Sequence, residues 1–222
     1  MAKATSAAPR RKRDAEQTRA DILQAALEEF SNMGHSGARV DRIAARAGIS
    51  KPMIYDYFGD KDAIYAASLR EAYIQIRRGE ADLDLDPGRP ERAVRELVRF
   101  TIDHYWRKPW FIRMLNNENL LGGDTIRSLH DAAGIQSVFV TRLEEVLRHG
   151  ESQGHFRRKV DPAEFYIFVA SICYFPISNM HTLRAVFAVP IDDAWIERWG
   201  NEAADMVLAY LRDPRDAAGE AG

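Results

Sequence analysis

Cysteine is almost absent from this 222-residue chain, and long uninterrupted apolar segments are missing. A single cysteine, Cys173, cannot form an intramolecular disulfide, and it suits a reducing compartment. The basic N-terminus is not followed by the apolar run of a secretory signal. The most apolar stretch, 165–183, contains serine, proline, asparagine and histidine, which argues against a membrane-spanning helix. We therefore expect a cytoplasmic protein without a membrane partner.

The sequence also lacks the short motifs that usually mark catalytic and metal sites. It contains no G-x-S-x-G, no glycine-rich phosphate loop, no C-x-x-C and no H-E-x-x-H. No two histidines have the helical spacing of a metal-ligand pair. We predict that the protein is not an enzyme and uses neither a metal ion nor a cofactor.

The net charge of −2 does not by itself suggest a nucleic-acid binder, but the charge is unevenly distributed. Residues 1–60 contain ten Lys and Arg against eight Asp and Glu, which leaves this part at +2 and the remainder at −4. A mildly acidic second domain commonly keeps a protein soluble. This uneven charge distribution is therefore compatible with DNA contact by residues 1–60 alone.

Apolar residues recur at helical spacing, whereas no strand pattern exceeds a few residues. In the first segment one stripe runs to Gly34 and comprises Ile22, Leu23, Ala26, Leu27, Phe30 and Met33. The pattern predicts an all-α fold of about nine helices, over 14–33, 40–47, 50–58, 61–78, 91–107, 110–121, 131–150, 162–187 and 192–211. Pro176 should kink or split the helix over 162–187 near Cys173, because proline removes one hydrogen bond and clashes with the preceding turn.

The stretch 39–61 is the most informative part of the chain. It predicts two short helices joined at Gly48, the second capped by Ser50, with Pro52 tolerated in its first turn. In this second helix Ile54 and Phe58 should face inward with Ile49. The outward or flanking side chains are those of Lys51, Pro52, Tyr55, Asp56 and Tyr57. This division is typical of a recognition helix that reads the major groove, although a surface helix of any small α-helical protein is the alternative.

The segment 18–61 resembles the DNA-binding domain of the tetracycline-repressor (TetR) family. The resemblance rests on an ordered set of residues: Ile22-Leu23-Gln24-Ala25-Ala26, Phe30, Gly34, Gly37, Val40-Asp41-Arg42-Ile43-Ala44, Ala47-Gly48-Ile49-Ser50, Tyr55, Tyr57-Phe58 and Lys61. The family consists of homodimeric, ligand-responsive transcription factors, most of them repressors. The implied partners are a double-stranded DNA operator, an unidentified small-molecule inducer and a second copy of the chain.

The resemblance also implies which side chains meet DNA. Ser50, Lys51, Pro52, Tyr55 and Tyr57 would face the major groove, and Lys61 would meet a phosphate. Two residues depart from the family pattern. Arg39 stands where the family often has a capping Thr or Ser; it can reach a phosphate, but the helix cap must come from elsewhere. Asp56 either accepts from a cytosine amino group or lowers non-specific affinity.

Four consecutive cations, Arg10, Arg11, Lys12 and Arg13, precede the first helix. They form either an arm that follows phosphates or enters the minor groove, or an inert solvated tail. We assign residues 1–13 to a disordered basic arm, 14–60 to the helix-turn-helix domain and 61–81 to a connecting helix. Residues 82–212 form the ligand-binding and dimerisation domain, and 213–222 a disordered tail.

The second domain matches the family more weakly. Residues 150–156 with Asp161-Pro162 look like the turn before the penultimate dimer helix, and 116–122 are similar to one C-terminal subgroup that includes catabolic-pathway repressors. The family implies a four-helix bundle built from the last two long helices of each subunit, 162–187 and 192–211. We place Val169 on that dimer face; burial in the core of one subunit is the alternative.

An inducer pocket should be an apolar cavity with a few placed polar groups, although an aromatic stripe at helical spacing is more often core. The candidates are Tyr105, Trp106, Trp110, Met114, Phe139, Phe168 and Cys173, with His104, Asn117 and Tyr174 as polar contacts. We expect a repressor that binds a near-palindromic operator as a dimer and is released by the inducer. The alternatives are an activator of the same family, or a helix-turn-helix protein that has lost DNA binding and serves as a protein-interaction module.

Overall fold

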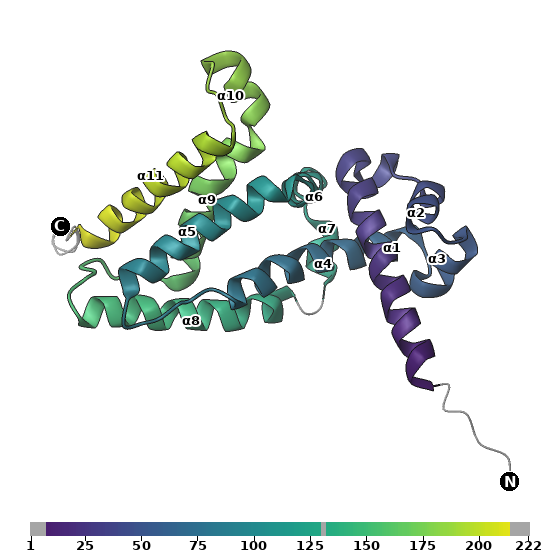
Figure 1. Cartoon of the computed structure of the whole chain (residues 1–222), viewed down its shortest axis with the longest axis horizontal. Coiled ribbons are helices and arrows are strands. Elements are labelled where there is room, and N and C mark those ends of the chain that lie inside the picture. The colour runs from purple at the N-terminus through teal and green to yellow at the C-terminus, as the bar shows by residue number, and fades with distance from the viewer. Residues whose placement is uncertain (1–7, 130–131, 214–222) are drawn as a thin grey trace, which may run out of the picture. The chain divides into compact units, whose positions relative to one another are not determined.

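The computed structural model describes residues 8–129 and 132–213 of the chain, and within them it contains eleven helices and no strand (Figure 1). The all-α prediction is confirmed. The helices are α1 (Ala8–Gly37), α2 (Val40–Ala47), α3 (Lys51–Phe58), α4 (Lys61–Ala81), α5 (Pro90–Arg107), α6 (Pro109–Leu120), α7 (Asp124–Ser128), α8 (Ala132–Ser152), α9 (Pro162–Ser178), α10 (Met180–Phe187) and α11 (Asp193–Arg212). No helix in the described part is long and apolar enough to cross a membrane.

Two helices are not predicted by the sequence pattern as separate elements: the short α7, and α10, which the pattern joins to α9. The break lies at Asn179, three residues beyond Pro176 rather than near Cys173. Proline at 176 leaves the carbonyl of Ile172 without a helical donor, and the indole Nε1 of Trp199 in α11 donates to this oxygen at 3.4 Å. This substitute bond explains how α9 continues through the proline.

The chain forms two compact units, Met1–Tyr73 with Arg113–His130, and Ile74–Ile112 with Asp131–Gly222. In the first unit the predicted stripe of α1 is buried except for Met33, which is exposed. The buried stripe therefore ends at Phe30, one turn before the kink at Gly34, where φ is 66°. Ile43 of α2 and Ile54 of α3 complete the centre of this core, and both are fully buried.

The segment around Asn117 is predicted to lie in the second domain, but it belongs to the first unit. The Asn117 side-chain amide donates to the Phe30 carbonyl at 3.2 Å. One carboxylate oxygen of the buried Glu118 accepts from the Tyr65 hydroxyl at 3.1 Å, and the other accepts from the Ile126 amide at 2.9 Å. The first two contacts hold the end of α6 to α1 and α4 of the unit that contains the helix-turn-helix, and the third ties α7 to α6.

In the second unit α5 packs along α11 and also contacts α8 and α9. At Gly200 of α11 the two helices approach closely, because a Cβ there would lie 3.2 Å from Cγ2 of Ile102. Val169, predicted on the dimer face, is fully buried within the subunit. The apolar side chains of α9 that are exposed instead are Ile167 at 62% and Phe175 at 58%.

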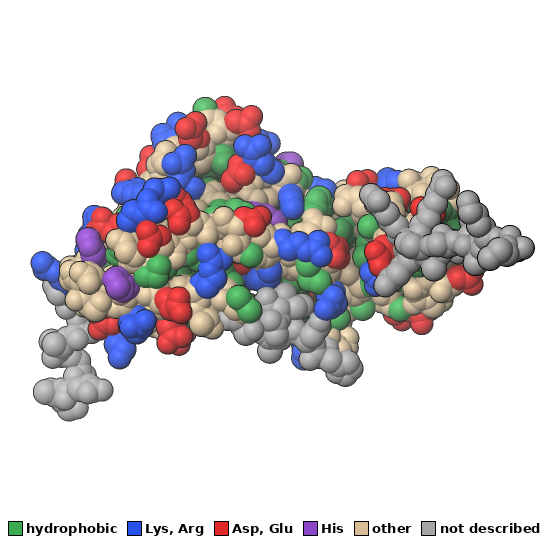
Figure 2. Space-filling model, turned by 60° about the horizontal axis from the view of Figure 1, so that its bottom comes forward, with side chains coloured by type: hydrophobic (Ala, Val, Ile, Leu, Met, Phe, Trp, Pro, Cys, Tyr) green, Lys and Arg blue, Asp and Glu red, His purple; other side chains and the backbone are tan. Residues whose placement is uncertain are grey.

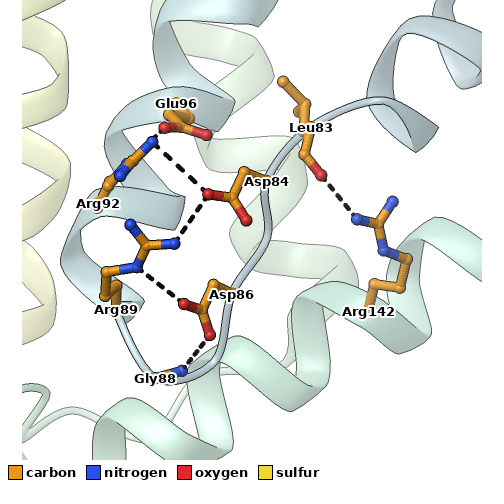
Figure 3. A network of polar contacts seen from close by, with 8 residues as sticks. All are labelled: Leu83, Asp84, Asp86, Gly88, Arg89, Arg92, Glu96 and Arg142. Atoms are coloured by element: carbon orange, nitrogen blue, oxygen red, sulfur yellow. Dashed lines mark hydrogen bonds and ion pairs between the residues drawn. The ribbon is translucent and has the colours of Figure 1, made fainter.

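The loop between α4 and α5 is fixed by a polar network (Figure 3). Asp86 accepts from the Gly88 amide and from Arg89 Nε, both at 2.8 Å, while Asp84 pairs with Arg89 Nη2 at 3.1 Å and with Arg92 at 3.6 Å. Arg142 of α8 donates to the carbonyls of Glu80, Ala81 and Leu83 at 3.3, 2.9 and 2.7 Å. A cation here satisfies the free carbonyls at the end of α4 and complements the helix dipole.

Candidate nucleic-acid interface

The first unit presents α2 and α3 as two short helices joined by a tight turn. Val40, Ile43 and Ala44 form the buried face of α2. Gly48 ends this helix with a φ of 69°, a left-handed conformation that favours glycine, and the Ile49 amide donates back to the Ala44 carbonyl at 3.1 Å. The turn allows α3 to begin three residues later at Lys51.

The third helix divides into an anchoring side and an exposed side. Ile54 is fully buried, and the half-buried Phe58 ring lies 4.9 Å from the Arg19 guanidinium of α1. The structure brings the predicted DNA contacts together on this helix: Ser50, Lys51, Pro52 and Tyr55 are exposed, and Tyr57 is half-buried. Ser50 occupies the N-cap position, but its side chain makes no capping bond among the described residues. Pro52 provides part of the reason, since it removes one of the two amides that a cap could bind.

The N-terminus of α2 is supported by α1 rather than by its own cap residue. Glu29 of α1 is buried, and its Oε1 accepts from the Arg39 amide at 3.1 Å. Arg42 lies 3.8 Å from the same oxygen. Arg39 therefore has an anchored backbone, while its guanidinium remains about two-thirds exposed. A glutamate ten residues away in sequence was not recognisable as this partner from the pattern alone.

The cations predicted to contact DNA have internal partners. Lys51 Nζ lies 3.0 Å from Asp41 Oδ1, and Arg39 Nη2 lies 3.9 Å from Asp41 Oδ2. The hydrogen bond to Asp41, together with its negative charge, raises the pKa of Lys51. Lys61 is half-buried, and its Nζ donates to the Ser36 carbonyl at 3.5 Å. On the face shown in Figure 2, blue and red side chains likewise alternate instead of forming a large field of one sign.

The basic stretch Arg10 to Arg13 lies at the start of α1, which begins at Ala8. The backbone of these four residues is thus helical, although their sequence predicts a disordered arm; arginine and lysine are good helix formers. The side chains of these four residues, and the tail from 214 on, lie outside what the structure describes. Their contact with DNA stays a prediction.

The predicted pocket residues are divided between the two units. Met114 and Asn117 belong to the first unit, and Tyr105, Trp110, Phe139, Phe168 and Cys173 to the second. Buried Tyr105 stacks on Phe111 with centroids 5.8 Å apart, and half-buried Trp110 meets Phe111 edge-on at 6.1 Å. Phe139 packs against Tyr166 at 5.1 Å, whereas Phe168 lies against Tyr210 of α11 at 5.0 Å.

Cys173 behaves as a core residue. Its Sγ lies 3.7 Å from the Val98 carbonyl, and burial raises the pKa of its thiol to about 12. A separate groove of about 700 Å³ runs between α5 and α11. Among the described residues that line this groove, Trp106 is the one predicted to line an inducer pocket.

A buried polar cluster in the second unit was missed by sequence reasoning. The Arg77 guanidinium pairs with the Glu80 carboxylate one turn away in α4, and it donates to the Tyr166 hydroxyl at 3.2 Å. That hydroxyl donates to the other Glu80 oxygen at 2.9 Å. Glu80 is fully buried, and this burial raises the pKa of its carboxyl. The i, i+3 spacing of Arg77 and Glu80 was visible in the sequence, but their partner Tyr166 lies 86 residues beyond Glu80.

His104 of α5 gives this unit a predictable response to pH. Its ring is buried and lies 5.2 Å from Phe111, and Nε2 has no hydrogen-bond partner among the described residues. Burial, assisted by the charge of Lys108, lowers its pKa to about 4. In the unfolded chain a histidine titrates near 6.5. Below pH ~6.5 the unfolded state therefore takes up a proton that the folded state does not bind until about pH 4.

We expect the free energy of unfolding to fall across this window, by up to ~3 kcal/mol through His104 alone. Other groups titrate here too, so the measurement is the difference between the wild type and His104→Phe. Urea unfolding at several pH values from about 7 to 4 should give a flatter profile for the variant. Parallel profiles for the two proteins would contradict a neutral buried His104.

The helix-turn-helix packs its apolar face into the core of the first unit and leaves the other side of α3 exposed, and a second helical unit follows. This is the architecture of a DNA-binding transcriptional regulator. Two family descriptions match the chain: "Bacterial regulatory proteins, tetR family" over residues 22–68, and "Tetracyclin repressor-like, C-terminal domain" over 90–207. The HTH-type transcriptional repressor NicS of Pseudomonas putida is 36% identical over 203 residues, which cover 91% of this chain and 96% of that protein. The chain belongs to the TetR family of transcriptional regulators.

Further relatives agree with this assignment. The HTH-type transcriptional repressor SCO4008 of Streptomyces coelicolor is 32% identical over 142 residues, covering 64% of this chain and 69% of that one. The crystal structure of the putative transcriptional regulator SCO4942 from Streptomyces coelicolor has a TM-score of 0.65 at 25% identity, with 90% and 99% of the two chains covered. The TetR family regulator PfmR of Thermus thermophilus has a TM-score of 0.63 at 23% identity over 85% and 97%, which shows the shared fold.

Proposed function

We propose that this regulator is a ligand-responsive repressor, with no enzymatic activity, that binds a near-palindromic operator as a dimer and leaves it when a small-molecule inducer binds. The observation that carries the proposal is the exposed side of α3, where Ser50, Lys51, Pro52 and Tyr55 project from a helix anchored by the fully buried Ile54. Tyr57, Arg39 and Lys61 flank this set of side chains and reach phosphates. Relatives named as repressors support repression over activation.

Dimerisation through α9 and α11 is supported by the apolar side chains that these helices leave exposed. They are Ile167 and Phe175 of α9, and Met206 and Tyr210 of α11. Burying these apolar side chains against a second copy would stabilise the dimer, because each Å² of apolar area removed from water contributes ~25 cal/mol of favourable free energy. A two-fold axis places two copies of α3 on the DNA, which requires half-sites related by near-palindromic symmetry.

The inducer belongs in the second unit, among the aromatic side chains around Tyr105, Trp110, Phe139 and Cys173. Helix α4 runs from the first unit into the second, and the unit boundary falls between Tyr73 and Ile74. Its last two turns are held by the Arg77–Glu80–Tyr166 cluster and by Arg142. An inducer that shifts these contacts moves the helix that carries the signal. Allosteric coupling of about 1–3 kcal/mol corresponds to roughly 5–150-fold weaker operator binding.

Selection of genomic DNA fragments by the purified protein tests this proposal. A short near-palindrome recovered beside a promoter supports a dimeric repressor, and transcription in vitro from that promoter separates repression from activation. Absence of enrichment at low salt would instead favour a helix-turn-helix that contacts protein. The genes beside the recovered site indicate which compounds to test as inducers.

Tyr55→Ala should remove most operator affinity without unfolding the protein. Tyr55 is 39% exposed, so its removal leaves the core intact. A good base or phosphate contact contributes about 1–3 kcal/mol, and a dimer loses it twice, which predicts a loss of at least ~30-fold. The variant Tyr55→Phe distinguishes the contribution of the hydroxyl to operator affinity from that of the aromatic ring. A Tyr55→Ala protein with wild-type thermal stability and undiminished operator affinity would refute this role.

A further inference from the structure

Two cations of the DNA-contacting set share one carboxylate. Asp41, in the first turn of α2, pairs through Oδ1 with Lys51 at 3.0 Å and through Oδ2 with Arg39 at 3.9 Å. All three side chains are exposed to solvent: Asp41 at 54%, Lys51 at 44% and Arg39 at 67%. One carboxylate thus lies within ion-pair distance of both cations, which the proposed function assigns to DNA.

We propose that Asp41 determines DNA specificity, an inference that rests on the proposed function. Its carboxylate takes the place of a phosphate on Arg39 and Lys51 and so suppresses sequence-independent binding. It also positions Lys51 for contact with the operator. The role is distinct from direct contact, because Asp41 itself repels the DNA backbone. It acts through the two cations that it holds.

The physical reason lies in how non-specific binding arises. Sequence-independent affinity comes from cations that displace counterions from phosphates, and each such contact steepens the dependence of affinity on salt. A lysine or arginine that must first leave a carboxylate contributes less to this affinity. Asp41 therefore lowers affinity for every DNA sequence in the mode that uses phosphates alone.

The operator complex does not carry the same penalty. A lysine ammonium has three N–H donors, so Lys51 can donate one to Asp41 and still offer two to base edges. Lys51 is the first residue of α3, the end of a recognition helix that reaches bases. Held from α2, it is ordered before binding and loses less side-chain entropy on the operator. Asp41 thereby weakens sequence-independent binding to phosphates more than it weakens specific binding to the operator.

A neighbouring ion pair provides a matched control. Glu28 of α1 pairs with Arg46 at 3.1 Å and is similarly exposed, but Arg46 is outside the DNA-contacting set. Glu28→Gln and Asp41→Asn each remove one negative charge from the same unit. Both break exposed ion pairs, which contribute little to stability, so both proteins should fold. Only Asp41→Asn releases Arg39 and Lys51.

The experiment measures affinity for a fragment selected by the wild type and for a scrambled duplex of equal length, over a range of salt concentrations. Asp41→Asn should bind the scrambled duplex about 5–10-fold more tightly near ~0.1 M salt, with a slope steeper by about 1 per subunit. The affinity of Asp41→Asn for the selected fragment should rise less. The ratio of its affinity for the selected fragment to its affinity for the scrambled duplex should therefore fall about five-fold. Asp41→Glu and Glu28→Gln should stay within about two-fold of the wild type in that ratio.

Equal gains by Asp41→Asn and Glu28→Gln would overturn the inference, because net charge alone would then explain them. In a Lys51→Met background the Asp41→Asn effect should be clearly smaller, because only the more distant Arg39 is then left to be released; an undiminished effect there would also overturn the inference. A wild type that prefers no fragment over the scrambled duplex refutes the proposed function itself. That result is distinguishable from a wild type that discriminates well but does not depend on Asp41.

Discussion

Arg77→Met should lower the free energy of unfolding of the second unit by about 3–5 kcal/mol, because it leaves the Glu80 carboxylate buried without its cation. Glu80 is fully buried and its other partner is the hydroxyl of Tyr166, which cannot neutralise a charge. Desolvation raises the pKa of Glu80, so in the variant its carboxyl should bind a proton more readily. The variant should therefore be least stable at high pH and recover part of its stability as the pH falls.

The second unit can be followed separately, because all four tryptophans, Trp106, Trp110, Trp195 and Trp199, lie in it. Urea unfolding monitored by tryptophan fluorescence, at fixed protein concentration, gives the required difference. Arg92→Met is the matched control, since Arg92 is largely exposed in the loop network of Figure 3. An exposed pair of this kind contributes no more than ~1 kcal/mol.

A double variant separates charge from packing. Arg77→Met combined with Glu80→Met removes both charges and should recover much of the stability, because apolar groups of similar size often replace a buried pair with little loss. If Arg77→Met alone costs no more than Arg92→Met, the cluster is not a buried ion pair of the kind described. If the double variant is stable but no longer responds to an inducer, the charges of the cluster are needed for signal transfer although the fold tolerates their joint removal.

The helix-turn-helix could be predicted from sequence because its determinants are local. Gly48 and Ile54 each fix a turn or an anchor within a few residues of the side chains that they position. The Glu29 contact with the Arg39 amide spans ten residues and joins two helices whose relative angle the pattern does not contain. The contact between the Asp41 carboxylate and Lys51 likewise depends on how α2 packs against α3, which only the three-dimensional structure reveals.

The second unit was harder to predict for a different physical reason. Helix α9 is apolar on nearly every side, so its sequence does not distinguish the face toward the core from the face toward a second subunit. The prediction for Val169 was wrong for this reason, and Ile167, two residues away, is the exposed residue. The Asn117 bond to the Phe30 carbonyl spans 87 residues and was equally inaccessible to pattern analysis.

Phe175→Glu should convert the proposed dimer to monomers. Phe175 is more than half exposed in one subunit, so an isolated chain can accommodate the glutamate in water. In the proposed dimer two such carboxylates, one from each subunit, would be buried without partners, and an unpaired buried charge costs several kcal/mol. Sedimentation should therefore show at least ~100-fold weaker association, which corresponds to a penalty of ~3 kcal/mol or more.

Three further variants test whether the face is correctly chosen. Val138→Glu changes a largely exposed side chain of α8 and should leave the dimer intact, because α8 is not part of the proposed interface. Ile167→Glu, on α9, should act in the same direction as Phe175→Glu. Val169→Glu differs from both, because Val169 is fully buried and its replacement should unfold the second unit instead of releasing folded monomers.

Loss of the dimer should also weaken operator binding, since a monomer contacts only one half-site and loses the benefit of linked binding. A folded Phe175→Glu monomer should still bind a single half-site weakly, with the salt dependence of one subunit rather than two. If Phe175→Glu and Ile167→Glu remain dimers at micromolar concentration, the subunits associate through another surface. The spacing of half-sites in the selected DNA would then have to be explained by that surface, because the position of the two-fold axis sets the distance between the two copies of α3.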